Sequence, residues 1–226
     1  MTITVIIPAL NEASNIAATI RHTAALGFDE IVVVDGGSVD RTRAEAEALG
    51  LARILACPPG RARQLNAGAG TSRSDVLLFL HADTRLPDRA RQLVESALAD
   101  RAVVGGRFDV RFDSPSLWAR IISAFMNLRS RHTRIATGDQ AMFVRRPVFE
   151  RLGGFSDIPL MEDVEFSARL KRTGPTEALR EPVVTSFRRW ERQGPLRTVL
   201  LMWTLRFLYW IGVSPHRLKN FYAAVR

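Results

Sequence analysis

Hydrophobic residues in the first hundred positions form short runs that alternate with segments of helical spacing. Runs of strand length occupy 2–8, 30–35 and 75–80, and helical spacing occupies 15–25 and 60–70. A run without polar alternation is typical of a strand buried on both faces, as in a parallel sheet covered by helices. The alternation therefore predicts an α/β fold with a doubly wound, mostly parallel central sheet flanked by helices.

The rhythm changes in the second hundred residues, where strands and helices no longer alternate. Gly105 and Gly106 interrupt one extended segment, and no internal repeat or linker marks a domain boundary. One domain followed by a helical tail at 191–226 is the simplest organisation. The expected elements are helices at 88–98, 117–128 and 164–172, extended segments at 103–112 and 177–187, and a short strand at 140–144.

The C-terminal tail combines an apolar run with basic residues. Residues 196–213 include Trp203, Tyr209 and Trp210, and Arg206 lies among them. A membrane-spanning helix needs about 20 apolar residues, more than this run supplies. Two interpretations of the predicted amphipathic helix stay open. It packs on the domain or on a second copy in a homo-oligomer, or it lies in a membrane interface as a peripheral contact.

Composition and charge limit the environment and the partners. The 226 residues carry a formal net charge of +9, which favours anionic partners such as phosphates, nucleic acid or an anionic membrane surface. The arginines are scattered rather than arranged in a recognition motif, so nucleic acid is not the expected partner. The single Cys57 fits a reducing compartment, and the N-terminus lacks the features of a signal peptide. We expect a cytoplasmic protein, free or peripheral at the inner face of the membrane.

Polar residues cluster where the predicted strands end. In open α/β sheets ligands bind outside the carboxyl ends of the strands, so these residues are expected at one crevice. The turn after the first strand lacks the G-x-G-x-x-G pattern that NAD or FAD would need. The residues are Pro8, Ala9 and Glu12 after the first strand, Asp35 after the second, and His81, Ala82 and Asp83 after the run at 75–80.

Two further segments allow both a ligand role and a structural one. Asp35 precedes two glycines that would let a ligand approach the backbone closely, but the same residues fit a turn followed by a helix cap at Asp40. Gly60 opens a predicted helix with Arg61 and Arg63 in its first turn. Cations there oppose the helix dipole, and a bound anion would resolve the conflict. The alternative is an exposed basic face.

Four sequence pieces occur in an order that is specific as a set. They are VIIPALNE at 5–12, IVVVDGGS at 31–38, LLFLHAD at 77–83, and GGF at 153–155 followed by MED at 161–163. Together they resemble family 2 glycosyltransferases with the GT-A fold, of the non-processive type similar to dolichyl-phosphate mannose synthase. The resemblance implies a single domain at 1–190, with a nucleotide-sugar-binding half at 1–100 and an acceptor half at 101–190.

The resemblance implies a UDP- or GDP-sugar donor, inverting transfer to an unknown acceptor, and Mg²⁺ or Mn²⁺ as cofactor. Asp83 would be the metal ligand, because oxygen ligands suit these ions and the segment stands in place of the family's Asp-x-Asp motif. His81 departs from that motif at its first acidic position. The implied donor-binding residues are Pro8, Ala9, Glu12, Asp35, Arg61, Asn66, His81, Ala82 and Asp83.

The second half supplies the implied catalytic base. Asp163 would take the proton of the acceptor hydroxyl, although an acidic first turn of a helix explains the same residue. Arg189 and Trp190 resemble the Arg-Trp motif of processive members, but Ser186 replaces their Gln, so processive synthesis is not expected. The residues implied near the acceptor or the diphosphate are Asp139, Gln140, Glu162, Arg188, Arg189 and Trp190.

Two functions therefore stand against each other. The first is an active transferase whose apolar tail leads to a lipid-linked or apolar acceptor. The second is a catalytically silent glycosyltransferase-like nucleotide-binding module. His81 in place of an acidic residue favours the silent module, whereas the presence of Asp83 and Asp163 favours the enzyme.

Overall fold

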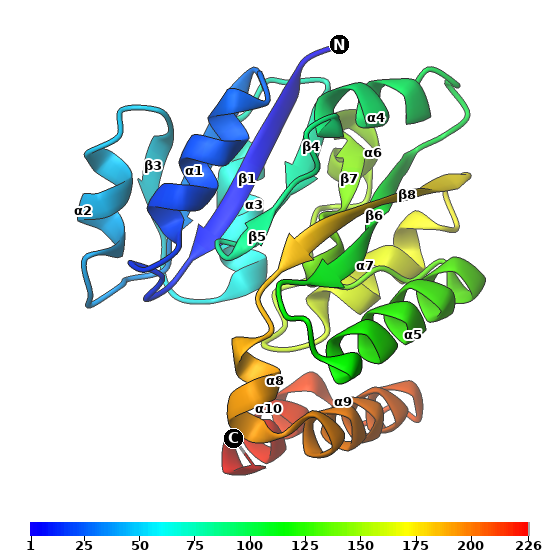
Figure 1. The fold of residues 1–226 in the computed structure, drawn as a ribbon. Coiled ribbons are helices and arrows are strands. Elements are labelled where there is room, and N and C mark those ends of the chain that lie inside the picture. Colours follow the sequence, from blue (N-terminus) through cyan, green and yellow to red (C-terminus); the bar gives the residue numbers. More distant parts are fainter. Residues whose placement is uncertain (226) are drawn as a thin grey trace.

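The computed structural model describes residues 1–225, and their side chains except those of Arg189 and 223–225. It is an α/β structure with one sheet between two layers of helices (Figure 1). The strands are β1 (Ile3–Ala9), β2 (Glu30–Asp35), β3 (Arg53–Ala56), β4 (Val76–Phe79), β5 (Thr84–Arg85), β6 (Gly105–Phe112), β7 (Phe143–Arg145) and β8 (Thr176–Thr185). The helices are α1 (Ile16–Ala25), α2 (Thr42–Glu47), α3 (Arg61–Thr71), α4 (Ala90–Ala97), α5 (Leu117–Thr133), α6 (Arg146–Arg151), α7 (Glu162–Leu170), α8 (Arg188–Gln193), α9 (Pro195–Trp210) and α10 (Pro215–Val225), with a 3-10 turn, η1 (Gly138–Gln140).

The strands form a sheet in the order β3-β2-β1-β4-β7-β6-β8-β5. The first four strands along the chain run parallel, as predicted, and β8 runs parallel to β6. The α/β fold is confirmed, but the sheet is mixed. Strand β7 enters between β4 and β6 in the opposite direction, and β5 pairs antiparallel with β8 at the edge.

Apolar side chains on both faces of the parallel strands explain the two helical layers. On β1, Val5 and Ile7 pack with α1 and α4, whereas Ile6 packs with α3 on the other face. The same division occurs on β4, where Leu78 and Leu77 point to opposite faces. The unbroken apolar runs are therefore strands buried on both sides, and their polar continuations gather at one sheet edge.

Three boundaries in the second half differ from the expectation. Gly105 and Gly106 do not break the strand but begin it. Glycine is needed at position 106 because a Cβ there would lie 2.4 Å from the carbonyl oxygen of Glu177 on the neighbouring strand. Gln140 belongs to η1 rather than to a strand, so the expected strand at 140–144 shrinks to β7. Helix α5 continues to Thr133, beyond the expected end.

The tail forms three helices rather than one. Gly194 and Gly212 adopt positive φ angles of 81° and 92°, a conformation that suits glycine, and each lies between two tail helices. Leu201, Leu205 and Leu218 of α9 and α10 pack against Met161, which precedes α7. Among the described residues, none of the helices combines the length and apolarity needed to cross a bilayer.

Candidate functional site

A cleft of about 1560 Å³ lies at the carboxyl ends of β1 and β4. Its walls come from the loops after these strands, the start of α3, the η1 turn, the start of α7, and helices α5, α9 and α10. The fold therefore brings together predicted residues from both halves of the chain. Those that line the cleft are Pro8, Ala9, Glu12, Arg61, His81, Ala82, Asp83, Asp139, Glu162, Asp163 and Trp190.

Asp83 lines the cleft just before the short strand β5. Burial raises the pKa of Asp83; the nearby His81 opposes this, and the negative charge of Glu12 adds to it. The Nη2 atom of Arg188 lies 2.8 Å from Oε2 of Glu12 and 3.5 Å from Oδ2 of Asp83. One guanidinium group thus contacts both carboxylates.

These two carboxylates fit a divalent cation. Mg²⁺ typically binds one or two carboxylates together with substrate phosphates, and Asp83 and Glu12 offer oxygen ligands of this kind. Across the described part of the chain, no group of three or more His, Cys, Asp or Glu residues is placed to hold a metal. The remaining ligands would have to be water or substrate oxygens.

Strand β5 ties the Asp83 loop to the second half. Thr84 pairs with Thr185 of β8, and their hydroxyl oxygens are 2.9 Å apart. Both threonines are buried. Asp83 and Arg188 therefore meet across a single pair of strands, although they are far apart in sequence.

His81 belongs to a second charged group in the cleft. Its Nδ1 lies 3.1 Å from Oδ1 of Asp139, and the guanidinium of Arg61 contacts its ring. Arg61 also pairs with Glu162, with 3.6 Å between Nε and Oε1. Burial raises the pKa of Glu162, the charge of Asp163 adds to the effect, and Arg61 opposes it. Arg61, which was expected to attract an anion, is thus paired with the Glu162 carboxylate of the second half.

Asp163 is the second residue of α7 and lines the cleft. Its two oxygens accept hydrogen bonds from the backbone N–H groups of Gly138 and Val164, both at 2.7 Å. The preceding Met161 has a positive φ of 70°, which is uncommon for a residue with a side chain and is held by apolar packing. A Cβ at Gly138 would lie 2.5 Å from Nε2 of His81, so the absence of a side chain at Gly138 lets η1 lie close to His81 and to Asp163.

Arg188 is not among the residues that line the cleft but contacts Asp83, which does; three further predicted residues do not reach the cleft. The carboxylate of Asp35 accepts hydrogen bonds from the backbone N–H groups of Gly37 and Ser38, as the structural interpretation expected. The amide of Asn66 donates to and accepts from the backbone of Phe155, so it fixes that loop instead of facing a ligand.

Gln140 is likewise a structural residue. It is fully buried, its Oε1 accepts a hydrogen bond from the Thr137 backbone and its Nε2 donates to Ser130. The expectation that it binds sugar or acceptor hydroxyls is corrected by this placement. The Arg189 side chain lies outside the described residues, and Trp190 stacks on Phe187 at an interplanar angle of 9°.

Sequence reasoning missed Arg129 of α5, which lines the cleft. Its Nε and Nη2 atoms are buried without a hydrogen-bond partner among the described residues. Burial lowers the pKa of Arg129, while Asp163 and Asp139 oppose this. The available signal was spacing, because Ile122, Met126 and Arg129 share one helical face and a charge interrupts that apolar stripe.

A comparison with protein families explains this arrangement. The model of the family described as "Glycosyl transferase family 2" matches residues 4–153. The chain belongs to glycosyl transferase family 2. The match includes the segments that end at Glu12, Asp35 and Asp83 and stops before Asp163. The predicted resemblance is thereby confirmed.

Relatives of this family 2 chain are longer than the chain itself. It is 28% identical over 197 residues to a "Probable glycosyltransferase YdaM" of Bacillus subtilis (strain 168), covering 76% of this chain and 47% of the relative. It is 34% identical over 93 residues to a glucosyl-3-phosphoglycerate synthase of Mycolicibacterium paratuberculosis, covering 36% of this chain and 28% of that one. The chain thus spans less than half of these relatives.

Solved structures confirm the GT-A fold of the family 2 chain. Residues 1–349 of S. aureus TarS with UDP-GlcNAc align with a TM-score of 0.65 at 15% identity, covering 82% of this chain and 58% of that one. Glucosyl-3-phosphoglycerate synthase of Mycobacterium tuberculosis with Mn²⁺, UDP-glucose and glycerol 3-phosphate aligns with a TM-score of 0.61 at 22% identity, covering 80% and 70%.

Proposed function

We propose that this chain is an inverting, metal-dependent glycosyltransferase that moves a sugar from a nucleoside-diphosphate donor to an acceptor hydroxyl. The observation that supports it most is the joint position of Asp83 and Asp163, which come from different halves and line one cleft. Structural neighbours in complex with UDP-GlcNAc or with UDP-glucose and Mn²⁺ favour a UDP-sugar over a GDP-sugar.

In this proposal Asp163 is the general base. Backbone hydrogen bonds from Gly138 and Val164 fix the orientation of its carboxylate. It takes the proton of the acceptor hydroxyl while that oxygen attacks the anomeric carbon, from the face opposite the leaving diphosphate. Its orientation by fixed donors limits the loss of side-chain freedom during the reaction.

Two arginines serve the leaving diphosphate in this proposal. Arg61 lines the cleft and Arg188 contacts Asp83, and guanidinium groups match phosphate oxygens in geometry and charge. Asp83 and Glu12 would hold the metal. A bound Mg²⁺ or Mn²⁺ neutralises charge that develops on the leaving group. Binding of metal and diphosphate would release Arg188 from the two carboxylates.

The experiment is a donor screen followed by one substitution. Melting temperatures with Mn²⁺ and UDP-glucose, UDP-GlcNAc or GDP-mannose identify the donor, and its hydrolysis or transfer is then measured. Asp163→Asn should lower turnover by about 10³-fold or more while Mn²⁺-dependent UDP binding stays unchanged. Asp88→Asn, at an exposed position before α4, is the control. Full turnover in Asp163→Asn contradicts the base assignment, and donor binding without turnover in the unaltered protein indicates the silent module.

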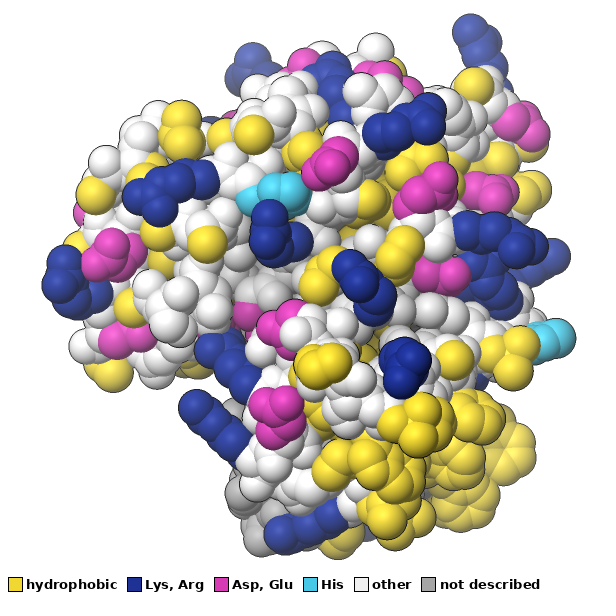
Figure 2. Space-filling view, viewed as in Figure 1, with side chains coloured by type: hydrophobic (Ala, Val, Ile, Leu, Met, Phe, Trp, Pro, Cys, Tyr) yellow, Lys and Arg dark blue, Asp and Glu magenta, His cyan; other side chains and the backbone are white. Residues whose placement is uncertain are grey.

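We also propose that the α5–α9 end of the molecule contacts an anionic membrane surface. Figure 2 shows hydrophobic side chains gathered at this end. Residues 191–226 contain six Lys or Arg residues and one acidic residue, so the charge complements anionic lipids. The exposed apolar residues are Trp118, Ile121, Phe125 and Leu128 on α5, and Leu196, Leu200, Trp203, Phe207 and Trp210 on α9.

Vesicle flotation tests this contact. The unaltered chain should float with vesicles that contain anionic lipid and should float less with neutral ones. Trp203→Ser with Phe207→Ser should abolish flotation, whereas Leu51→Ser, at an exposed apolar position elsewhere, should not. Point substitutions are preferable to deletion of the tail, since α9 and α10 cover Met161 beside the site. A stable dimer without flotation would favour the homo-oligomer interpretation instead.

A further inference from the structure

Two partly buried arginines that line the cleft have buried nitrogens without a hydrogen-bond partner among the described residues. They are Arg129 of α5, at Nε and Nη2, and Arg206 of α9, at Nη2. Buried guanidinium groups are costly unless hydrogen bonds compensate them, and buried polar groups are normally paired. Within the described structure, no other buried side-chain nitrogen or oxygen lacks a partner. This coincidence within one cleft requires an explanation.

Both arginines extend from apolar helix faces that meet each other. Ile122 and Met126 precede Arg129 on one face of α5, and they pack in a cluster that includes Val199 of α9. Arg206 lies two turns beyond Val199 on α9. The two charges are therefore set into an apolar chamber instead of a solvated basic surface.

The chamber is continuous with the reacting end of the cleft. Leu205, next to Arg206, packs against Met161, which immediately precedes Glu162 and Asp163. Arg129 senses the charges of Asp163 and Asp139, although neither carboxylate is within hydrogen-bonding distance of its unpaired nitrogens. A group bound by these arginines would thus lie beside the proposed base.

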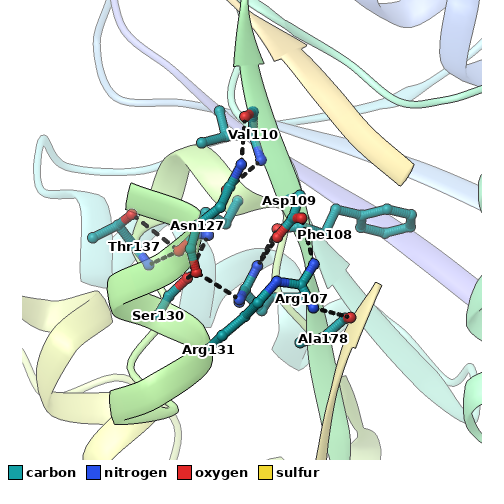
Figure 3. Close-up of polar contacts among 10 residues, drawn as sticks. Arg107, Phe108, Asp109, Val110, Asn127, Ser130, Arg131, Thr137 and Ala178 are labelled. Atoms are coloured by element: carbon teal, nitrogen blue, oxygen red, sulfur yellow. Dashed lines mark hydrogen bonds and ion pairs between the residues drawn. The ribbon is translucent and has the colours of Figure 1, made fainter. Parts of the chain in front are cut away.

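Neighbouring arginines show that the fold can pair such groups when they are structural. Arg107 and Arg131 both bind Asp109, and Arg131 also donates to the carbonyl oxygen of Ala178 at 3.3 Å (Figure 3). Arg131 is two residues from Arg129 on the same helix, yet both of its terminal nitrogens have hydrogen-bond partners. The unpaired nitrogens of Arg129 and Arg206 belong to guanidinium groups that line the cleft, so a ligand that enters the cleft can meet these groups and supply the missing acceptors.

We infer that Arg129 and Arg206 bind the anionic group, a phosphate or a carboxylate, of an amphiphilic acceptor whose apolar part lies between α5 and α9. Guanidinium groups match both anions in geometry, and the apolar walls fit a hydrocarbon body. Calling the ligand an acceptor rests on the proposed glycosyl transfer; the binding itself does not. The donor diphosphate is assigned to the opposite wall, with Asp83 and Arg188.

Calorimetry with octyl phosphate, below its micelle-forming concentration, tests the inference on the full chain. Inorganic phosphate carries the anion alone, and octyl glucoside carries the same chain on an uncharged head. We expect octyl phosphate to bind at least tenfold more tightly than either. Arg129→Gln and Arg206→Gln should each weaken it at least tenfold, whereas Arg120→Gln, on the exposed side of α5, should not.

The same samples are titrated with UDP and Mn²⁺. Unchanged UDP binding in Arg129→Gln supports two separate subsites, and equal loss of UDP binding would move Arg129 to the donor site and overturn the inference. Undiminished octyl phosphate binding in both arginine variants also overturns it. Equal affinity for inorganic phosphate and octyl phosphate would contradict the proposal that the ligand has an apolar part. Failure of UDP binding in the unaltered chain would instead count against the proposed donor chemistry.

Discussion

Arginines on the two sides of helix α5 differ in their hydrogen bonding. We call the side toward the sheet, with Arg107 and Arg131, the closed side, and the side toward the cleft, with Arg129, the open side. Toward the sheet, Asp109 holds Arg107 and Arg131 by ion pairs (Figure 3). Toward the cleft, Arg129 keeps two nitrogens unpaired among the described residues. Burial lowers the pKa of both Arg107 and Arg129, but only Arg107 donates a hydrogen bond to a carboxylate, that of Asp109, which offsets this effect. The ion pairs on the closed side stabilise the fold, whereas the unpaired guanidinium on the open side is available to a ligand. Such a division is expected where stability and function compete.

The same substitution on each side gives the sharpest test. Arg107→Met should reduce the free energy of unfolding by about 3 kcal/mol, because it leaves Asp109 buried with one partner fewer. Arg129→Met should be neutral or stabilising by about 1 kcal/mol, since it removes an unpaired buried charge. Urea unfolding of both variants measures the difference. A large loss at Arg129 would mean that its guanidinium is structural after all.

Ligands should stabilise the open side. UDP with Mn²⁺ at about 100 times its dissociation constant should add about 2.7 kcal/mol to the free energy of unfolding, which for a chain of this size corresponds to roughly 5 to 10 °C. Asp83→Asn should remove most of the Mn²⁺-dependent part, whereas Arg107→Met should keep it. Thermal melts with UDP alone and with UDP plus Mn²⁺ separate the two contributions. Equal shifts in Asp83→Asn and the unaltered protein would remove Asp83 as a metal ligand.

A neutral pair of substitutions extends the comparison to uncharged groups. Asn127 on the closed side exchanges two hydrogen bonds with the backbone of Val110, at 2.9 Å and 3.0 Å. Asn127→Ala should cost about 1 to 2 kcal/mol because those backbone groups lose their partner. Asn220, exposed at the cleft, should tolerate Ala within about 0.5 kcal/mol. Similar costs at both positions would erase the distinction for uncharged side chains.

The smallest expected effect is a pH dependence of stability on the open side. Because burial raises the pKa of Glu162, the folded state holds its proton more tightly than the unfolded state does. The contribution is fully present below the ordinary Glu pKa and is lost as pH rises through the raised value. The free energy of unfolding should therefore decline over that window, and Glu162→Gln should flatten the decline. An unchanged pH profile in Glu162→Gln would contradict the assignment.

The first half of the fold could be predicted from local patterns. Unbroken apolar runs define β1, β2 and β4, and the rule that ligands bind at strand ends brings Glu12 and Asp83 to one cleft. The mixed sheet could not be predicted, because β7 is three residues long and carries no periodic signal. Strand direction there depends on long-range packing.

Side-chain roles were harder to predict than positions in the chain. Asn66 and Gln140 lie in the right segments, but their amides satisfy backbone and hydroxyl groups that only the folded loops bring near. Arg129 escaped notice because sequence alone does not tell a charge at the edge of an apolar stripe from one held inside it. Pairing is a property of the folded neighbourhood, so unpaired charge can be recognised only in the structure.

Strand β5 has only two residues, but it positions the Asp83 loop relative to β8. Its register pairs Thr84 with Thr185, and this pairing sets the distance between the Asp83 loop and Arg188. A slip of one position would turn the buried Thr84 to the other face and carry its neighbour about 3.3 Å along the strand. That is several times the ~0.5 Å tolerance within which reacting groups must be held. The hydrogen bond between the hydroxyl groups of Thr84 and Thr185 thus fixes the register in which the two halves of the chain pair.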